Sequence, residues 1–337
     1  MKKLCCTAVS ILLLILVISC NSQDDNTLVI YAYDSFVSEW GPGPAIVPLF
    51  EEATGYTVEL ESRGDAMQVI SQAVLEKNDP QADVLIGVDN NSLAYVLEQD
   101  LFEQWTPESL SVVPERLRFD PTGHVTPYDY GYFSIIYDSE TISSPPVTLE
   151  ELTQEQWADS LILMDPRTSS PGLGFFLWTI DAYGEDFTDY WRRLEPSILT
   201  ITDGWDSGYG LFTEGEAPMV LSYTTSPAYH VEYEDTTQYQ AALLENGNYM
   251  QVEGMGILKG ADNQEAARAF IEFALSPEFQ SQIPLTNWMY PVNPNVDLPD
   301  SFEYAPEPSE SRMLEFSRID ENRNSWIRQW SQIFTAN

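Results

Sequence analysis

Cysteine and histidine are scarce in this 337-residue chain. The cysteines are Cys5, Cys6 and Cys20, all within the first twenty residues, and the only histidines are His124 and His230. The rest of the chain therefore has no thiol for an internal disulfide, a catalytic nucleophile or a cysteine-type zinc site. We expect a hydrophobic core that is large enough to keep the fold stable without disulfide bonds. The chain is long enough for two domains or one large one.

Motifs of the common enzyme classes are also missing. The sequence contains no HExxH, no G-x-S-x-G and no P-loop, and "PGLG" (171–174) lacks the glycine spacing of a dinucleotide fingerprint. Carboxylates are so abundant that no pair stands out as a glycosidase acid and nucleophile. The sequence therefore predicts a protein that is not an enzyme and that needs no metal or cofactor.

Positively charged residues are also scarce. The chain has 15 Lys and Arg against 53 Asp and Glu, which gives a net charge of −38. Nucleic acid is excluded as a partner, because phosphate binding needs clustered basic side chains. The acidic surface suits a saline habitat and favours a cationic ligand only weakly, since salt screens exposed charges within about 10 Å.

The N-terminus has the pattern of an export signal. Residues 1–20 read "MKKLCCTAVSILLLILVISC": two lysines, then an apolar run that is too short to span a membrane comfortably. "VISC" resembles the lipobox of bacterial lipoproteins, which predicts cleavage before Cys20 and a lipid on that cysteine. Residues 21–27 would be a polar tether. An uncleaved anchor helix is the alternative.

Strand and helix patterns alternate from residue 27 onward. "TLVIYAY" (27–33), "TVELES" (57–62) and "ADVLIGVD" (82–89) have the composition of strands, and "DAMQVISQAVLEK" (65–77) has apolar residues at helical spacing. This alternation predicts an α/β fold, with a mostly parallel sheet and helices on both faces. Ligands of such sheets bind beyond the carboxyl ends of the strands, where Asp65 lies.

Aromatic residues gather beside turn residues. Several aromatics in loops indicate a pocket for a flat or cationic ligand, held by stacking and cation–π contacts of about 0.5–2 kcal/mol each. The hydroxyls of "SYTTSP" and "TSSPG" would then orient its polar groups. The aromatics in question are Trp40, Tyr128, Tyr130, Tyr132, Trp205, Tyr223, Tyr229, Trp288 and Tyr290.

Several strings resemble the thiamine-binding periplasmic protein family, the substrate-binding proteins of an ABC importer. The resemblance covers residues 28 to about 334, and "SYTTSPAY" and "NWMYP" are its most specific parts. In chain order the strings are "YAYDSFVSEWGPGP", "ADVLIGVDNN", "PYDYGYFSIIYD", "DPRTSSPGLGFFLW", "GWDSGYGLF", "LSYTTSPAYH" and "IPLTNWMYPVN".

The resemblance implies a two-lobed fold of the type II periplasmic-binding class. Residues 28–128 and 258–337 would form the first lobe and 129–257 the second, with a ligand cleft between them. Binding would close the cleft, and the closed form would be recognised by the membrane permease.

It also implies a ligand, thiamine and its mono- and diphosphate, and a set of contacts. The rings would be surrounded by Tyr33, Trp40, Trp205, Tyr229 and Trp288. The polar contacts would come from Asp65 and Ala66, from Ser169 and Ser170 at the hydroxyethyl or phosphate end, and from a wall made of Tyr223, Thr224, Thr225, Ser226 and Pro227. Ala66 departs from the family, which commonly has glycine there.

The resemblance further implies partners and a location. A monomer in the periplasm, lipid-anchored through Cys20, would deliver thiamine to an ABC permease and its ATPase subunit.

Two alternatives share the expected fold. A ferric-ion binding protein would use tyrosinates such as Tyr223 and Tyr229, and a polyamine-binding protein would use the same aromatic and carboxylate groups.

Overall fold

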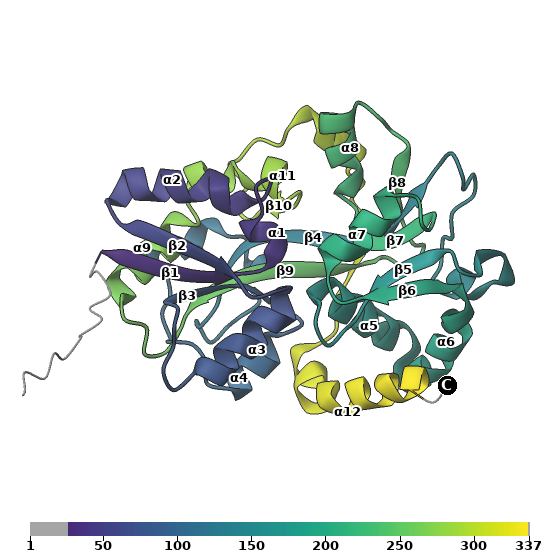
Figure 1. Cartoon of the computed structure of the whole chain (residues 1–337), viewed down its shortest axis with the longest axis horizontal. Coiled ribbons are helices and arrows are strands. Elements are labelled where there is room, and N and C mark those ends of the chain that lie inside the picture. Colours follow the sequence, from purple (N-terminus) through teal and green to yellow (C-terminus); the bar gives the residue numbers. More distant parts are fainter. Residues whose placement is uncertain (1–25, 336–337) are drawn as a thin grey trace, which may run out of the picture.

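The computed structural model of the chain describes residues 26–335, which form two halves joined by two long strands, β4 and β9 (Figure 1). Residues 1–25, which include the predicted signal and Cys20, lie outside the described part. The strands are β1 (Thr27–Ala32), β2 (Thr57–Ser62), β3 (Val84–Asp89), β4 (Thr126–Asp138), β5 (Leu161–Met164), β6 (Ile198–Thr202), β7 (Met219–Tyr223), β8 (Tyr239–Ala242), β9 (Asn248–Ile257), β10 (Tyr290–Pro291) and β11 (Ser311–Arg312).

The sheet is parallel at its two flanks and antiparallel in the middle. Its main order is β2-β1-β3-β9-β4-β7-β5-β6. β1 pairs in parallel with β2 and β3, and β5 pairs in parallel with β6 and β7. β9 runs antiparallel to both β3 and β4, and β4 runs antiparallel to β7. The predicted α/β alternation is confirmed at the flanks, while β9 was not predicted.

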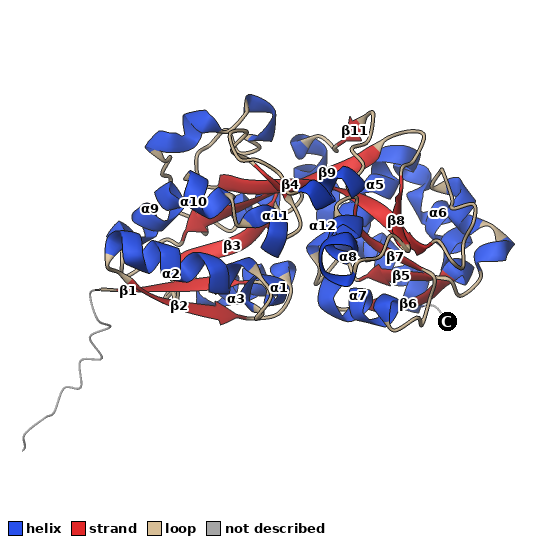
Figure 2. Cartoon of the chain, turned by 90° about the horizontal axis from the view of Figure 1, so that it is seen from above, coloured by secondary structure: helices blue, strands red, loops and turns tan. Residues whose placement is uncertain are grey.

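Helices cover the sheet on both faces, as the view from above shows (Figure 2). They are α1 (Asp34–Val37), α2 (Pro42–Thr54), α3 (Ala66–Glu76), α4 (Leu93–Glu98), α5 (Ser170–Tyr183), α6 (Phe187–Leu194), α7 (Trp205–Thr213), α8 (Ser226–Glu234), α9 (Gln264–Phe273), α10 (Pro277–Gln280), α11 (Ile283–Thr286) and α12 (Phe316–Thr335), with short 3₁₀ turns between some of them. No described helix is both long and apolar enough to cross a bilayer.

Local sequence explains where several helices start and stop. α2 begins with Pro42, whose fixed φ suits a first helical position. It ends at Gly55, whose φ of +80° is a left-handed conformation that glycine adopts without strain. α10 starts at Pro277, and the Ser276 side chain accepts a hydrogen bond from the Phe279 amide.

The C-terminal helix α12 packs against both halves. It contacts α4 and α6, and in Figure 1 it runs beneath α5 and α6. Trp330 of α12 lies edge-on to Trp191 of α6, with ring centroids 5.6 Å apart. The predicted lobe boundaries at 128 and 258 stay a prediction. These boundaries assign α12 to the first lobe, although the helix also covers α6 of the second.

Candidate functional site

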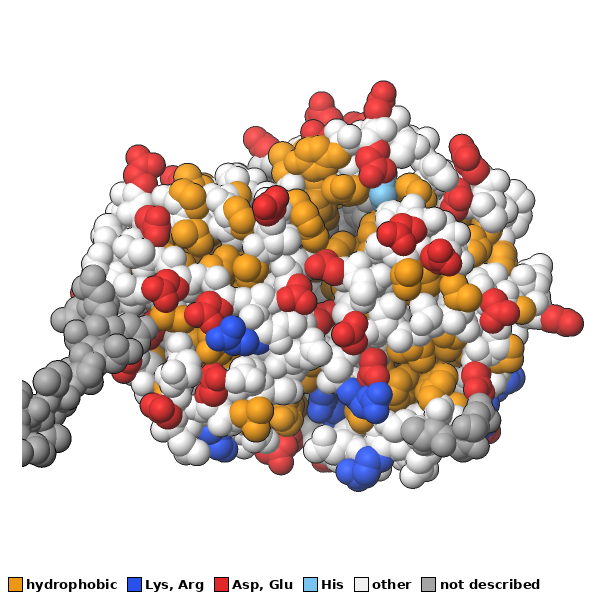
Figure 3. Space-filling model, viewed as in Figure 1, with side chains coloured by type: hydrophobic (Ala, Val, Ile, Leu, Met, Phe, Trp, Pro, Cys, Tyr) orange, Lys and Arg blue, Asp and Glu red, His pale blue; other side chains and the backbone are white. Residues whose placement is uncertain are grey.

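A cavity of about 560 Å³ lies between the two halves. Figure 3 shows the hollow, bordered by hydrophobic and acidic side chains. Its wall comes from the turn after β1, the starts of α3, α5 and α7, the end of β7, α8, the middle of β9 and the segment after α11. The predicted residues that line it are Tyr33, Trp40, Asp65, Ser170, Trp205, Tyr223, Ser226, Tyr229 and Trp288.

Other predicted residues are buried beside the cavity instead of lining it. Ala66 is the first residue of α3, and Ser169 immediately precedes α5. Thr224 and Thr225 connect β7 to α8, where the Thr224 amide donates to the Tyr132 carbonyl at 2.9 Å. Pro227 lies in the first turn of α8. Their roles as ligand contacts stay a prediction.

The expectation that the aromatic residues of the site lie in loops is wrong for Trp205 and Tyr229, which lie near the starts of helices. Trp205 is the first residue of α7, after Gly204, and Tyr229 lies in the first turns of α8. "SYTTSPAYH" is therefore the end of a strand and the start of a helix. The helix start fixes the direction of each ring more firmly than a loop would.

The rings line two sides of the cavity. On one side Trp205 stacks on Tyr209, with centroids 4.9 Å apart, and Trp40 lies 6.3 Å from Trp205. Trp40 is half exposed at the mouth. On the other side Tyr229 meets Trp288 edge-on at 5.3 Å.

Trp288 has an unusual backbone. Its φ is +55°, in the left-handed region that bulky residues rarely adopt. The ring is held from behind by Phe302, which stacks on it at 6.4 Å, and only 9% of Trp288 is exposed. Phe302 belongs to the 3₁₀ turn Asp300–Tyr304. A strained residue held by its surroundings at a cavity wall indicates a functional constraint.

Asp65 links the two halves across the cavity. Its Oδ2 accepts a hydrogen bond from the backbone amide of Trp205 at 2.8 Å, and its side chain also caps α3 together with Gln68. One carboxylate therefore faces the positive ends of two helix dipoles. Burial nevertheless raises the pKa of Asp65 to about 6, although these hydrogen bonds oppose the shift.

The floor of the cavity is a buried hydrogen-bond network that the sequence analysis missed. Glu253 of β9 accepts hydrogen bonds from the hydroxyls of Tyr33 and Tyr128, both at 3.0 Å. Asn287 donates to the Tyr33 hydroxyl at 3.1 Å. The signal in the sequence was a single acidic residue in the mostly apolar run "MQVEGMGIL".

The described lining is acidic and contains no Lys or Arg. Burial raises the pKa of Asp206 to about 6, and the nearby charge of Asp65 adds to the shift. The carboxyl-bearing residues of the lining are Asp34, Asp65, Asp203, Asp206, Glu234 and Glu253. A cavity of this charge attracts a cation and repels an anion.

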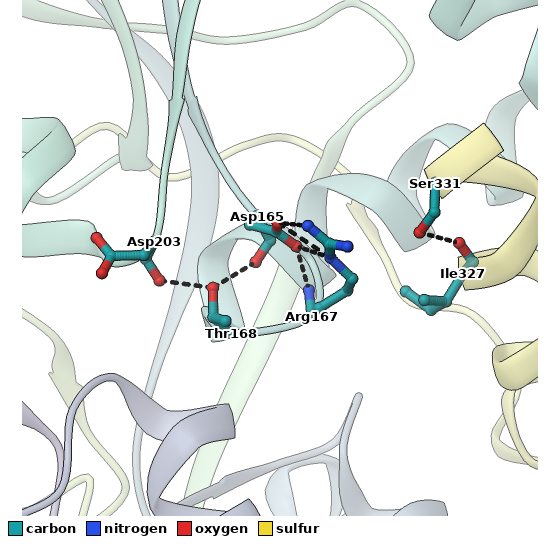
Figure 4. Close-up of polar contacts among 6 residues, drawn as sticks. All are labelled: Asp165, Arg167, Thr168, Asp203, Ile327 and Ser331. Carbon is teal, nitrogen blue, oxygen red and sulfur yellow. Dashed lines mark hydrogen bonds and ion pairs between the residues drawn. The ribbon is translucent and has the colours of Figure 1, made fainter. Parts of the chain in front are cut away.

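The turns just before α5 and α7 are joined to each other (Figure 4). The Thr168 hydroxyl donates to the carbonyl of Asp203 at 2.7 Å. Arg167 is engaged by Asp165, with Nε 2.9 Å from Oδ1, and its guanidinium also lies over the ring of Trp330. The cation nearest in sequence to Ser169 and Ser170 is therefore already paired with a carboxylate.

The arrangement suits reversible binding of a flat, positively charged molecule. Aromatic faces can stack on its rings and carboxylates can neutralise its charge. Within residues 26–335 no group of three His, Cys, Asp or Glu side chains is placed to hold a metal ion. The cavity size falls within the range typical of small-molecule sites.

Comparison with known proteins gives consistent matches over nearly the whole chain. Residues 45–308 match the family model of bacterial extracellular solute-binding proteins. The chain is 39% identical over 311 residues to the thiamine-binding periplasmic protein of Brucella suis biovar 1, covering 92% of each chain. It is 38% identical over 306 residues to the protein of that name from Escherichia coli K12, covering 90% of this chain and 92% of the other.

Solved structures agree on the fold. A periplasmic thiamin binding protein superimposes with a TM-score of 0.87 at 37% identity, covering 92% of this chain and 96% of its own. A ferric binding protein from Campylobacter jejuni superimposes with a TM-score of 0.75 at 20% identity, over 91% of this chain and 99% of its own. This second likeness concerns the fold alone. The predicted α/β fold of the periplasmic-binding class is confirmed.

Proposed function

The chain belongs to the bacterial extracellular solute-binding proteins and, among them, to the thiamine-binding periplasmic protein family, and we propose that it captures thiamine in the cavity between its halves for delivery to an ABC permease. It is a periplasmic binding protein and not an enzyme. The observation that carries the choice of ligand is the cavity lining, which combines aromatic rings with carboxylates and has no described Lys or Arg. Thiamine joins an aminopyrimidine to a permanently positive thiazolium ring, and this lining complements both parts.

In the proposed complex the rings of Tyr33, Trp40, Trp205, Tyr229 and Trp288 surround the ligand. Asp65 and the backbone at Ala66 contact its polar nitrogens. Tyr223 and the segment Thr224–Pro227 form one wall, of which Tyr223 and Ser226 face the cavity. The segment's buried threonines support the wall from behind.

Ser169 and Ser170 at the start of α5 would receive the hydroxyethyl end of thiamine. A helix start also offers backbone amides to a phosphate, so the mono- and diphosphate esters belong to the proposal. The carboxylates of the lining and the engagement of Arg167 by Asp165 oppose an added dianion. We therefore propose the order thiamine first, then its monophosphate, then its diphosphate.

We also propose a lipid anchor on Cys20, supported by the "VISC" string and the basic, apolar leader. The anchored, monomeric protein would hand its ligand to the permease and ATPase subunits of the importer. Replacing Cys20 by Ala should move the protein from the membrane fraction to the soluble fraction, whereas replacing Cys6 should not. Equal membrane fractions for wild type and Cys20→Ala would contradict the anchor.

The ligand is tested by calorimetric titration of the protein that starts after Cys20. Thiamine, its two phosphates, spermidine and ferric citrate are titrated separately. We expect saturable binding of thiamine at a single site. Binding of spermidine with no response to thiamine would favour a polyamine-binding protein, and binding of ferric citrate alone would favour a ferric-ion binding protein.

A further inference from the structure

Two carboxyl groups lie side by side at the cavity floor. Asp129 of β4 and Glu253 of β9 are directly paired across the antiparallel strands. Glu253 is 4% exposed and faces the cavity, whereas Asp129 is fully buried behind it. Like charges opposite each other in a sheet repel, so this register is costly if both groups are ionised.

Hydrogen bonds distinguish the two carboxyls. Glu253 Oε2 accepts from Tyr33 and Tyr128 at 3.0 Å, and its Oε1 lies 3.3 Å from Gln251 Nε2. Asp129 Oδ2 accepts from Asn287 Nδ2 at 2.5 Å, but no described donor reaches its buried Oδ1. An unpaired, buried oxygen is best satisfied when Asp129 itself carries a proton. Glu253 has the donors that a carboxylate needs.

Within residues 26–335, no Lys or Arg lines the cavity floor or is among the main charges that act on this pair. The titratable groups around Glu253 are Tyr33, Tyr128, Asp129 and Asp89. Gln251 connects Asp89 to Glu253, since its Nε2 lies 2.9 Å from Asp89 Oδ2 and also contacts Glu253. Tyr223 faces the same network, since its hydroxyl donates to Gln251 Oε1 at 2.7 Å. Each of these neighbours is neutral or negative.

Burial and these like charges favour the protonated forms of both carboxyls, so below about pH 7 Asp129 and Glu253 each carry a proton. Burial, followed by the charge of Glu253, raises the pKa of Asp129 well above its ordinary value. Burial raises the pKa of Glu253 to about 7, although the tyrosine hydrogen bonds lower it. The ligand-free cavity therefore has a floor whose charge changes near neutral pH.

We infer that Glu253 is the carboxylate that selects the positive ring of the ligand, and that this ring expels a proton from the Asp129–Glu253 pair as it binds. The inference rests on the proposed binding of thiamine. The O–H bond of the Glu253 carboxyl breaks, its proton passes to the solvent, and the resulting carboxylate stays opposite the thiazolium. Asp129 keeps its proton and so limits the negative charge of the floor.

Binding of the cation and ionisation of Glu253 are linked. A cation binds the ionised form of Glu253 more strongly, so binding lowers the pKa of that group. Below the ligand-free pKa, each thiamine bound releases a proton and the affinity rises with pH. Above it Glu253 is already ionised, so the release disappears and the affinity levels off.

The test is calorimetry of thiamine binding at about pH 6 and about pH 8.5. At each pH the titration is run in two buffers of different ionisation enthalpy, and the difference in heat gives the number of protons released. For the wild type we expect close to one proton at the lower pH and close to none at the higher, with several-fold tighter binding at the higher. Glu253→Gln should lower the release at the lower pH by most of a proton, leaving the share of Asp65 and Asp206, whose pKa values are about 6. It should also bind thiamine at least tenfold more weakly at the higher pH. Exposed Glu278, in the first turn of α10, provides the control Glu278→Gln, which should match the wild type.

A second variant keeps the inference testable if Glu253→Gln fails to fold. Asp129→Asn replaces a neutral carboxyl by a neutral amide that can still donate to Glu253, so the release at the lower pH should persist. Loss of the release in Asp129→Asn would place the released proton on Asp129 and overturn the inference. Thiamine binding with equal proton release in wild type, Asp129→Asn and Glu253→Gln would overturn the inference and leave the proposed function intact. A wild type that binds no thiamine at either pH would instead overturn the proposed function.

Discussion

The carboxylate of Asp65 accepts a hydrogen bond from the backbone amide of Trp205 across the ligand cavity, at 2.8 Å. Asp65 precedes α3 in one half of the protein, and Trp205 begins α7 in the other. The contact therefore joins the two halves across the cavity. Gly204 allows it, since a Cβ there would lie 3.1 Å from Asp65 Oδ2.

Replacing Asp65 by Ala should therefore weaken thiamine binding by about tenfold or more, which corresponds to about 1.4 kcal/mol. It should also lower the free energy of unfolding by about 1 kcal/mol, because α3 loses its cap. Asp65→Asn keeps an acceptor oxygen and should lie between Ala and wild type in both properties. Calorimetry and denaturant unfolding measure the two effects. An Ala variant with wild-type affinity would show that the contact does not contribute to binding.

The aromatic walls give a second prediction. Trp205→Ala and Tyr229→Ala should each weaken thiamine binding by about tenfold or more, since each removes a ring face with a contact energy of up to about 2 kcal/mol. The exposed residue Tyr304, outside the cavity lining, provides the control Tyr304→Ala, which should bind as the wild type does. Unchanged titration curves for both cavity variants would remove these rings from the binding site.

The fold was predictable from the sequence where signals are local. The run 57–62 is β2 and the stretch 65–77 contains α3, because β-branched residues and apolar residues at helical spacing act within a few residues. The start of α10 is equally local, since Ser276 caps it and Pro277 is its first residue. The antiparallel centre was not predictable, since the pairing of β4 with β9 joins segments far apart in the chain.

The site divides in the same way. The rings of Trp205 and Trp288 stand out because aromatics next to turn residues are visible in the sequence itself. Glu253 and Asn287 did not stand out, because a carboxyl in a strand and an amide in a turn acquire their role only from the Tyr33 and Tyr128 hydroxyls. Burial and partners, which decide the chemistry of such groups, are properties of the folded chain.

The left-handed backbone of Trp288 gives a third prediction, on stability. At ordinary positions glycine is less stable than alanine by roughly 0.5–1 kcal/mol. At a φ of +55° a side chain is strained, so glycine should be the more stable of the two by about 1 kcal/mol. Trp288→Gly should thus have a higher free energy of unfolding than Trp288→Ala, although both should bind thiamine weakly.

Denaturant unfolding checks the order of the Trp288 variants. The exposed residue Asn324 in α12 supplies the comparison, because Asn324→Ala should be more stable than Asn324→Gly in an ordinary helix. If alanine is also the more stable residue at position 288, the left-handed conformation there is not a source of strain.

The buried carboxyls give a fourth prediction, on how stability depends on pH. Burial raises the pKa of Asp65 and of Asp206 to about 6, and the pKa values of Asp89, Asp129 and Glu253 are raised as well. A carboxyl whose pKa is higher in the folded protein than in the unfolded chain stabilises the fold at low pH. This contribution is complete below the unfolded value of about 4 and is lost as the pH rises through the folded value.

The ligand-free protein should therefore melt at a higher temperature near pH 5 than near pH 8, with most of the decrease between about pH 4 and about pH 7. The net charge of −38 acts in the same direction, because self-repulsion grows as carboxyls ionise. Glu253→Gln should flatten the decrease, since an amide carries no charge at either pH, and exposed Glu278→Gln should leave its slope unchanged. Saturating thiamine should raise the melting temperature more at pH 8 than at pH 5, because the cation compensates the charges that cost stability. A melting temperature that increases from pH 5 to pH 8 would mean that these carboxyls gain more from their hydrogen bonds than they lose by burial.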